Sequence, residues 1–316
     1  MNRGLSLKNQ PQRKAIMASQ PIGAIHRLAS AWDLWKLYRR RRFGSAEAEV
    51  RLHAEISALL STYTGLAPGA PARILDLGCG QMARQVALFA ADGARVTGVD
   101  VELPTYRLNP AILLRVLRHN GGERAIKSLA RYIFFDPAYQ RELRRRYPRE
   151  APYDQLDARL MSASQLDFPG DHFDLVYSVW AFEHFEDVPA AVREVDRTLK
   201  TTGVAVIYIH LYPSLSGGHH LDWLSPDTSP SRRVPPWDHL RQQRYPANFY
   251  LNRLRLQDYR RIFEGNLDVI DEQTIEEGHA LLTPALWEEL SARGYTREDL
   301  LTRSVRLICR KKPRNE

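Results

Sequence analysis

Apolar residues recur at two spacings along this chain, and the two spacings alternate. Short runs rich in branched apolar residues predict strands, because buried strands of a parallel sheet read as nearly continuous apolar segments; these runs are 73–78, 94–100, 173–180, 204–211, 267–275 and 303–311. Apolar residues at helical spacing lie between them and predict helices at 82–91, 187–200, 256–265 and 284–293. Gly203 is expected to end the helix before the fifth strand. Alternating strands and helices predict an α/β fold with a mostly parallel sheet.

The segment before the first strand predicts two helices and a tail. Residues 1–20 are basic without apolar periodicity, and we expect them to be disordered. Residues 22–42 place apolar residues and two tryptophans at helical spacing and end in four arginines. This helix either packs on the core or on a partner, or lies on an anionic membrane surface. Ser45 can cap a second helix, so 21–64 are N-terminal helices and 65–316 the main domain.

Two long segments interrupt the strand–helix alternation. The first, 103–150, is called the helical insert. Asn109–Pro110 and Asp136–Pro137 are cap-plus-proline pairs that predict helices at 110–119, 123–135 and 137–147. The second, 212–250, is called the cover loop, and its aromatic and apolar content argues against disorder. Both are expected beside the ligand site, the insert as a lid, although an oligomer contact or a solvated surface is the alternative.

Charge is distributed unevenly along the 316 residues, whose net charge is +8. The first 43 residues hold ten Lys and Arg against one acid, and the insert holds eleven against four. The rest of the chain therefore has a net negative charge, whereas a nucleic-acid-binding protein is expected to carry positive charge on its active face. No apolar run is long enough to cross a membrane, and no secretory signal is evident. Two cysteines without metal-ligand spacing fit a reducing cytoplasm, with contact at the inner membrane face as an option.

A glycine turn and an acid carry the clearest chemical signal. Ile74–Gly80 is an apolar strand ending in Gly-Cys-Gly, and the next strand ends at Asp100. Glycines let a ligand approach the backbone, and an acid at the next strand end can bind ribose hydroxyls. With Phe173–His184 and Leu199–Ile207, these segments resemble the ordered motifs of class I S-adenosylmethionine-dependent methyltransferases. The resemblance implies a Rossmann-like, doubly wound, seven-stranded sheet with an antiparallel last strand.

The resemblance also implies S-adenosylmethionine as cofactor and assigns residues to it. Asp76 would orient the methionine amino group, and Asp100 would hold the ribose, with Glu102 as a weaker rival. The complete set of expected cofactor-binding residues is Asp76, Gly78, Gly80, Asp100, Ser162, Ala163, Ser178 and Val179. Two departures from the family pattern stand out: Gln81–Met82 replaces a further glycine, and Ser162 replaces an acid near the adenine.

Histidines after the fourth and fifth strands are the candidates for a general base. His184 and His210 are placed at strand ends where a base could take the proton of an attacking hydroxyl. Glu183 beside His184 could raise the pKa of that imidazole. The substrate residues expected on the cover loop are His219, His220, Trp223, Trp237 and His239. A divalent metal held by His219, Asp222 and neighbours is less favoured, because mixed nitrogen and oxygen ligands suit no metal strongly.

These observations predict a methyltransferase that O-methylates a glycan, a glycolipid precursor or a natural-product hydroxyl. Two segments over the cleft suggest a sizeable small-molecule or glycan acceptor, and tryptophan rings suit sugar or aromatic rings. An RNA methyltransferase is an alternative, but no Asn/Asp-Pro-Pro-aromatic motif follows the fourth strand, where Ser178–Ala181 stands. A non-catalytic, membrane-associated scaffold that keeps the fold is another.

Overall fold

Seven strands form one sheet in the order β3-β2-β1-β4-β5-β7-β6. Their bounds are β1 Arg73–Leu77, β2 Arg95–Asp100, β3 Asp157–Leu160, β4 Phe173–Val179, β5 Leu199–His210, β6 Leu267–Glu276 and β7 Thr302–Lys311. Strand β7 runs antiparallel to both of its neighbours, and the pairs among β1 to β5 are parallel. The fold class predicted from the sequence is confirmed.

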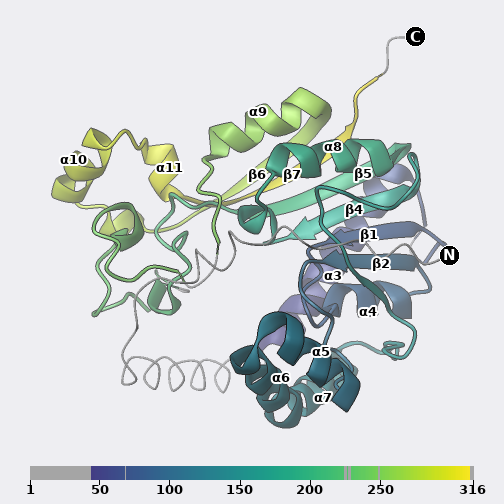
Figure 1. Cartoon of the computed structure of the whole chain (residues 1–316). Coiled ribbons are helices and arrows are strands. Elements are labelled where there is room, and N and C mark those ends of the chain that lie inside the picture. The colour runs from purple at the N-terminus through teal and green to yellow at the C-terminus, as the bar shows by residue number, and fades with distance from the viewer. Residues whose placement is uncertain (1–43, 68, 224–225, 227–228, 248–249, 314–316) are drawn as a thin grey trace. The chain divides into compact units, whose positions relative to one another are not determined.

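Helices cover both faces of this sheet (Figure 1). Helices α3 (Gly44–Thr64) and α4 (Arg84–Ala91) pack on one face through Ile56, Val86 and Phe89. Helices α8 (Val188–Thr198) and α9 (Leu256–Asn266) pack on the other. Strands β1, β4 and β5 are buried on both faces, because they lie at the centre of these three layers. All carboxyl ends of the parallel strands therefore meet at one edge.

The computed structural model describes residues 44–313, except 68, 224–225, 227–228 and 248–249. The predicted disordered tail at 1–20 and the predicted helix at 22–42 lie outside the described residues, as does any membrane contact of that helix. Among the described residues, no helix is both long and apolar enough to cross a membrane.

The helical insert consists of α5 (Pro110–Asn120), α6 (Gly122–Phe134) and α7 (Asp136–Arg146), as expected. The Asn109 side chain caps α5 by accepting a hydrogen bond from the Ile112 amide at 2.8 Å. The expected cap at Asp136 is wrong. This residue lies inside α7 and pairs with Arg131 instead, 3.4 Å away. Helix α7 anchors the insert by packing on α3 and α4.

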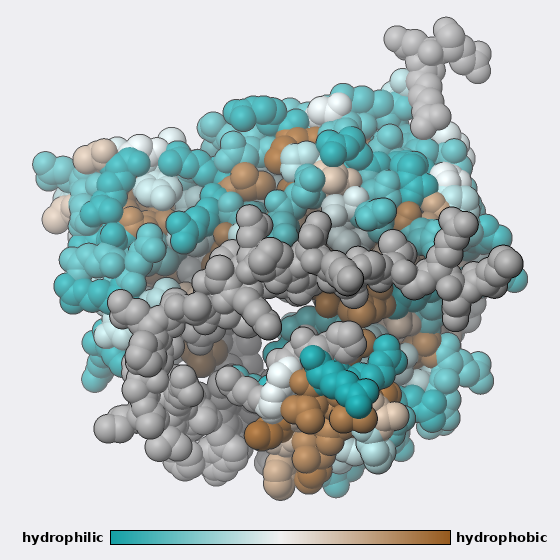
Figure 2. Space-filling view, in the orientation of Figure 1, coloured by the Kyte–Doolittle hydropathy of each residue, from teal (hydrophilic) through white to brown (hydrophobic). Residues whose placement is uncertain are grey.

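An apolar surface lies on α5 and α6, where Figure 2 shows brown side chains gathered on one face. Ile126 and Phe134 are the most exposed of these, at 70% and 71%. The other exposed large side chains of the two helices are Leu114, Leu117, Leu129, Tyr132 and Ile133. This surface is larger than the scattered apolar residues of an ordinary protein surface and is typical of a contact region.

The described residues of the cover loop contribute to a small apolar core of their own. It packs against α10 (Pro284–Ala292) and α11 (Arg297–Leu301), which lie between β6 and β7 in the sequence. Trp223 and Trp237 stand at the centre of this apolar cluster. Helix α11 is absent from the sequence-based prediction, because a five-residue helix carries too few apolar positions to show a period.

The expected end of the helix before the fifth strand is wrong. Helix α8 ends at Thr198, and β5 already begins at Leu199, so Gly203 lies inside the strand. A Cβ atom at Gly203 would lie 3.0 Å from the carbonyl oxygen of Phe173 on the paired strand. This glycine therefore permits a close backbone approach at a register shift rather than ending a helix.

Candidate active site

The glycine turn after β1 is shaped by a close contact with the loop after β4. Gly78 and Gly80 have φ angles of 80° and 66°, which favour glycine. A Cβ at Gly78 would lie 2.3 Å from the Cβ of Ala181, so this position has no room for a side chain. The space beside Gly80 is open, with no atom within 4 Å of where its Cβ would stand. The turn thus offers exposed backbone to a ligand.

Asp100 holds this turn in place from the end of β2. Its carboxylate accepts hydrogen bonds from the Gly80 amide at 2.9 Å and the Glu102 amide at 2.8 Å. Burial raises the pKa of this carboxyl, although both amides act in the opposite direction. The rival acid Glu102 is instead engaged with Arg124 of the insert. Of the two acids, Asp100 is therefore the one positioned to meet a ligand on the turn.

Asp76 lies below the turn and is 4% exposed. Its carboxyl accepts a hydrogen bond of 2.8 Å from the Tyr177 hydroxyl on β4. Burial raises the pKa of Asp76 to about 8, although this hydrogen bond lowers it. Tyr177 is missing from the sequence-based site, because an aromatic residue inside a strand looks like ordinary core packing.

The remaining cofactor candidates occupy three places. Ser178 is buried and donates a hydrogen bond of 2.7 Å to the Leu77 carbonyl, which ties β4 to β1 just before the glycine turn. Val179 is partly buried at the end of β4. Ser162 is exposed and shares a 2.8 Å hydrogen bond with Ser164, and Ala163 is buried. Their roles in cofactor binding stay predictions.

Three histidines and one glutamate meet at the carboxyl edge of the sheet. The His219 ring lies between the other two, with ring centroids 5.3 Å from His184 and 4.6 Å from His210. Glu183 is 2% exposed, and its carboxylate lies 4.0 Å from Nε2 of His219. We call Glu183, His184, His210 and His219 the histidine cluster. Both expected base candidates therefore stand together, with one expected substrate residue between them.

Hydrogen bonds to the cluster assign protons on two imidazoles. Ser216 donates its only hydroxyl proton to Glu277 at 2.6 Å, so Nε2 of His210, 2.8 Å away, must donate to Ser216. This leaves the lone pair of His210 on Nδ1. His184 has Nδ1 3.0 Å from the Tyr250 carbonyl, which only accepts, so its lone pair is on Nε2.

The pKa values in the cluster are set mainly by burial. Burial lowers the pKa of His184, and the nearby Asp100 charge raises it to a smaller extent. The expectation that a neighbouring carboxylate raises the pKa of His184 above its usual value is therefore wrong. Burial also lowers the pKa of His219 to about 4 and that of His210 well below its usual range. Burial raises the pKa of Glu183 to about 8.

The other expected substrate residues also lie on the cover loop and make their own contacts there. His239 donates from Nε2 to the Tyr212 carbonyl at 2.8 Å, and Nδ1 of His220 accepts from the Asp222 amide at 3.1 Å. Trp223 and Trp237 are 3% and 0% exposed, so neither ring presents a face to solvent. Substrate contacts for these four residues stay predictions.

Trp180 is an aromatic residue that the sequence-based site leaves out. It follows β4 directly, is 43% exposed, and has a φ of 54°, a strained value for a bulky side chain. Its ring centroid lies 6.1 Å from that of His210. An exposed aromatic face beside the histidine cluster suits an acceptor ring. Only the left-handed backbone, which the sequence does not reveal, turns this residue outward.

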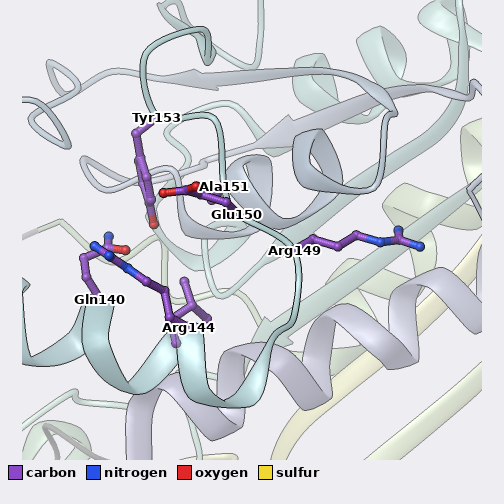
Figure 3. A pocket seen from close by; sticks show the side chains of 7 residues that line it. Gln140, Arg144, Arg149, Glu150, Ala151 and Tyr153 are labelled. Atoms are coloured by element: carbon purple, nitrogen blue, oxygen red, sulfur yellow. The ribbon is translucent and has the colours of Figure 1, made fainter.

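A small cavity lies elsewhere, between α7 and the segment that follows it (Figure 3). Its volume is about 50 Å³, far below what a substrate-sized ligand needs. Gln140 and Arg144 line it from α7, and Glu150 and Tyr153 from the other side, whereas the Arg149 side chain points away. None of the expected site residues lines this cavity, so it is not the active-site candidate.

Part of the chain is similar to known methyltransferases. Residues 113–207 match a family model described as a methyltransferase domain. A curated protein of Bacillus subtilis (strain 168), named the uncharacterized methyltransferase YcgJ, is 44% identical over 52 residues, or 16% of this chain. The match covers 21% of that protein, so the chain spans about a fifth of the length of its curated relative.

Solved structures match the chain at low identity and low TM-score. The crystal structure of YcgJ has 20% identity and a TM-score of 0.41, and the match covers 83% of this chain and all of that one. The crystal structure of the [4+2]-cyclase SpnF has 17% identity and a TM-score of 0.40, with 81% and 80% covered. At these values, the likeness bears on neither reaction nor substrate.

Proposed function

We propose that the chain is a class I S-adenosylmethionine-dependent methyltransferase that transfers a methyl group to a hydroxyl, a proposal supported by the match of residues 113–207 to a methyltransferase domain. The acceptors we favour are a glycan, a glycolipid precursor or a natural product. One observation carries the proposal: the glycine turn held by Asp100 and the histidine cluster meet at one edge of the sheet. The loop from Ala181 to His184 joins them, since Ala181 packs on Gly78.

The residues at the turn fit the cofactor of this family. The open space beside Gly80 and the carboxylate of Asp100 suit a ribose. In this proposal, Ser162 and Ala163 would contact the adenine edge. Asp76, with Ser178 and Val179 on the neighbouring strand, would face the methionine end. When bound, the cofactor supplies a sulfonium methyl group, and the protein's task is to position an acceptor and exclude water.

His184 is the first candidate for the base that takes the acceptor's proton. Its Nδ1–H is directed at the Tyr250 carbonyl, so Nε2 carries the lone pair that a base needs. The loop that carries His184 begins at Ala181, which packs on Gly78 of the glycine turn. His210 is the second candidate, because its Nδ1 is likewise the basic nitrogen.

Titration calorimetry with S-adenosylmethionine tests the donor half of the proposal. We expect one site per chain in the intact protein and at least a tenfold weaker site in Asp100→Ala, because two hydroxyls would lose a charged acceptor. Asp268→Ala, an exposed acid on β6, is the matched control and should bind like the unmodified protein. No heat at high protein concentration would exclude methyl transfer and leave the scaffold alternative.

A mass-spectrometric screen tests the acceptor half. Pools of glycans, lipid-linked sugars and aromatic natural products are incubated with the cofactor, and a gain of about 14 daltons marks the acceptor. We expect the gain on a hydroxyl. Methylation of RNA alone, with binding that weakens steeply as salt rises, would replace this proposal with the RNA alternative.

A further inference from the structure

Three members of the histidine cluster have the composition of a metal site. Glu183, His210 and His219 each place one ligand atom so that all three lie within 4.8 Å of one another. They come from three separate parts of the fold: the short helix Phe182–His184 after β4, the end of β5, and the cover loop. Ligands from separate elements that converge on one point are typical of a binding site rather than of chance neighbours on a surface.

The carboxylate of Glu183 supplies an independent reason to expect a cation. Neither carboxyl oxygen has a hydrogen-bond partner among the described residues, although the side chain is only 2% exposed. Buried polar atoms without a hydrogen-bond partner are rare, because each one costs free energy. A cation beside it would offset that cost.

The His210 ring is fixed by hydrogen bonds of the kind that usually support a metal-binding histidine. Nε2–H donates to Ser216, and Ser216 donates to the buried carboxylate of Glu277. This chain fixes the ring and leaves Nδ1 as the nitrogen with a lone pair. A carboxylate behind a histidine, which orients its ring and makes it more basic, is the usual outer support of a metal ligand.

We propose that Glu183, His210 and His219 bind one divalent first-row transition-metal ion. Two imidazoles and one carboxylate suit zinc, manganese or iron better than magnesium or calcium, which prefer oxygen. The 4.0 Å between Glu183 and His219 must shorten to about 3.4 Å for metal–ligand bonds of about 2.1 Å in tetrahedral geometry. The three ligand atoms, which lie within 4.8 Å of one another, would all have to draw together around the ion. Three protein ligands leave at least one position open, as in catalytic metal sites.

The open position gives the metal a role that rests on the proposed methyl transfer. An acceptor hydroxyl there becomes more acidic, because a cation stabilises the developing negative charge on oxygen. The hydroxyl gives its proton to the base proposed above. Its oxygen then forms the C–O bond to the methyl group as the C–S bond breaks, and that electron pair stays on sulfur. With His210 bound to the metal, His184 is the remaining base.

Metal binding by the full-length protein, measured without S-adenosylmethionine, tests the site itself. The protein is stripped with a chelator and titrated with Mn²⁺ and with Zn²⁺. We expect one ion per chain, and a loss of at least about tenfold in affinity in Glu183→Gln and in His219→Gln, since each removes one of three ligands. The control is His279→Gln, an exposed histidine paired with Glu276 far along the chain.

A second readout keeps the test decisive if a variant folds poorly. Co²⁺ bound by two imidazoles and a carboxylate absorbs visible light, and Glu183→Gln should change that spectrum while thermal unfolding stays cooperative. If Glu183→Gln unfolds, Glu183→Asp replaces it, with a weaker site expected because the shorter side chain withdraws the oxygen. The proposal is overturned if the intact protein binds none of the three ions, or if folded Glu183→Gln and His219→Gln bind as tightly as the intact protein.

The same measurements separate this inference from the proposed function. Asp100→Ala should keep its metal while losing cofactor affinity, because Asp100 contributes no ligand to the site. Metal binding without cofactor binding would leave the site standing and remove the methyltransferase proposal. Cofactor binding without metal binding would remove the metal site and leave the methyltransferase proposal standing.

Discussion

Gly78 shows how one residue couples the two halves of the site. Its missing side chain lets Ala181 pack on the turn, and Ala181 begins the loop that carries Glu183 and His184. A change at this position should therefore disturb the cofactor turn and the histidine cluster together.

We expect Gly78→Ala to lower the free energy of unfolding by about 1–3 kcal/mol and to weaken cofactor binding. The added Cβ would stand 2.3 Å from that of Ala181, at a φ of 80°. Gly80→Ala is the matched control for stability, since it has a similar φ but no atom within 4 Å. Urea unfolding measures both variants. Equal losses would mean that backbone strain alone accounts for the effect.

His184→Gln tests the base at the same scale. Glutamine keeps an N–H that can donate to the Tyr250 carbonyl, so the loop should keep its position. The turnover rate is expected to fall by about 10²–10⁴, the usual contribution of a general base, with the cofactor affinity unchanged. Steady-state kinetics on the identified acceptor, together with calorimetry, separates the two effects. An unchanged turnover rate would assign the proton to another residue.

At the scale of elements, Arg131 ties the helical insert to the glycine turn. From α6 it donates to the Thr105 hydroxyl at 2.7 Å and to the Gln81 side chain at 3.4 Å, and it pairs with Asp136. These contacts join the expected lid to the residues that stand where relatives have a further glycine. Whether the insert moves as a lid stays a prediction.

We expect Arg131→Ala to detach α6 and weaken cofactor binding, because it leaves buried acceptors and Asp136 without their partner. The cost to folding should be about 1–3 kcal/mol. Hydrogen exchange should rise in α5 and α6 while β1 and β4 stay protected. Arg144→Ala, an exposed arginine of α7, is the control. Equal exchange in both variants would show that the insert is held by α7 alone.

His53 links three elements and makes their packing dependent on pH. Its Nε2 lies 2.9 Å from the Asp92 carboxylate at the end of α4 and 3.2 Å from the Tyr147 hydroxyl after α7. Burial lowers the pKa of His53, an effect that the neighbouring Arg149 strengthens and Asp92 opposes. The pKa of Asp92 is also lowered, by its hydrogen bonds from Tyr147 and His53, against burial.

The unfolded chain should therefore take up a proton on His53 before the folded protein does. Stability is fully present above about pH 6.5 and falls as the pH drops below it, by at most about 1.4 kcal/mol per pH unit from this group. His53→Gln, which keeps a donor for Asp92, should show a shallower fall between about pH 6.5 and 5. Urea unfolding across this range measures the difference. Parallel curves for both proteins would contradict the assignment.

Element types were largely predictable, and their exceptions have local causes. Continuous apolar runs predicted β1, β2 and β4, because burial on both faces of the sheet leaves a clear pattern. The pairs Asn109–Pro110 and Asp136–Pro137 predicted the helices of the insert. Gly203 and Asp136 were misread. A glycine near a helix end and an acid before a proline are typical cap signals, but here each residue serves a tertiary contact instead.

For the whole molecule, residues 42–316 form one compact unit. Within the part of the chain that the structure describes, the buried clusters are built from Ala46 onward. We expect a chain without residues 1–43 to keep its cofactor affinity and its unfolding midpoint. Thermal unfolding and calorimetry check this. A large loss of either would show that the N-terminal segment packs on the core.

Flotation with anionic vesicles compares the same two chains. Binding that disappears with residues 1–43 would support the membrane interpretation of the helix predicted at 22–42. Binding that persists would point instead to the exposed apolar surface of α5 and α6. No binding by either chain would leave the packed interpretation of the N-terminal helix.

The fold class, the glycine turn and Asp100 can be recognised from the order of residues along the chain alone. These depend on neighbouring residues and on strand order, and both are readable as local patterns. Which polar side chains come together at the site depends on the tertiary structure. Glu183 follows β4, His210 ends β5 and His219 lies on the cover loop, and the three converge because β4 and β5 end at one edge of the sheet, where the cover loop begins. The same packing leaves Trp223 and Trp237 buried and Trp180 exposed. Side-chain convergence depends on packing between distant segments, which no local pattern records.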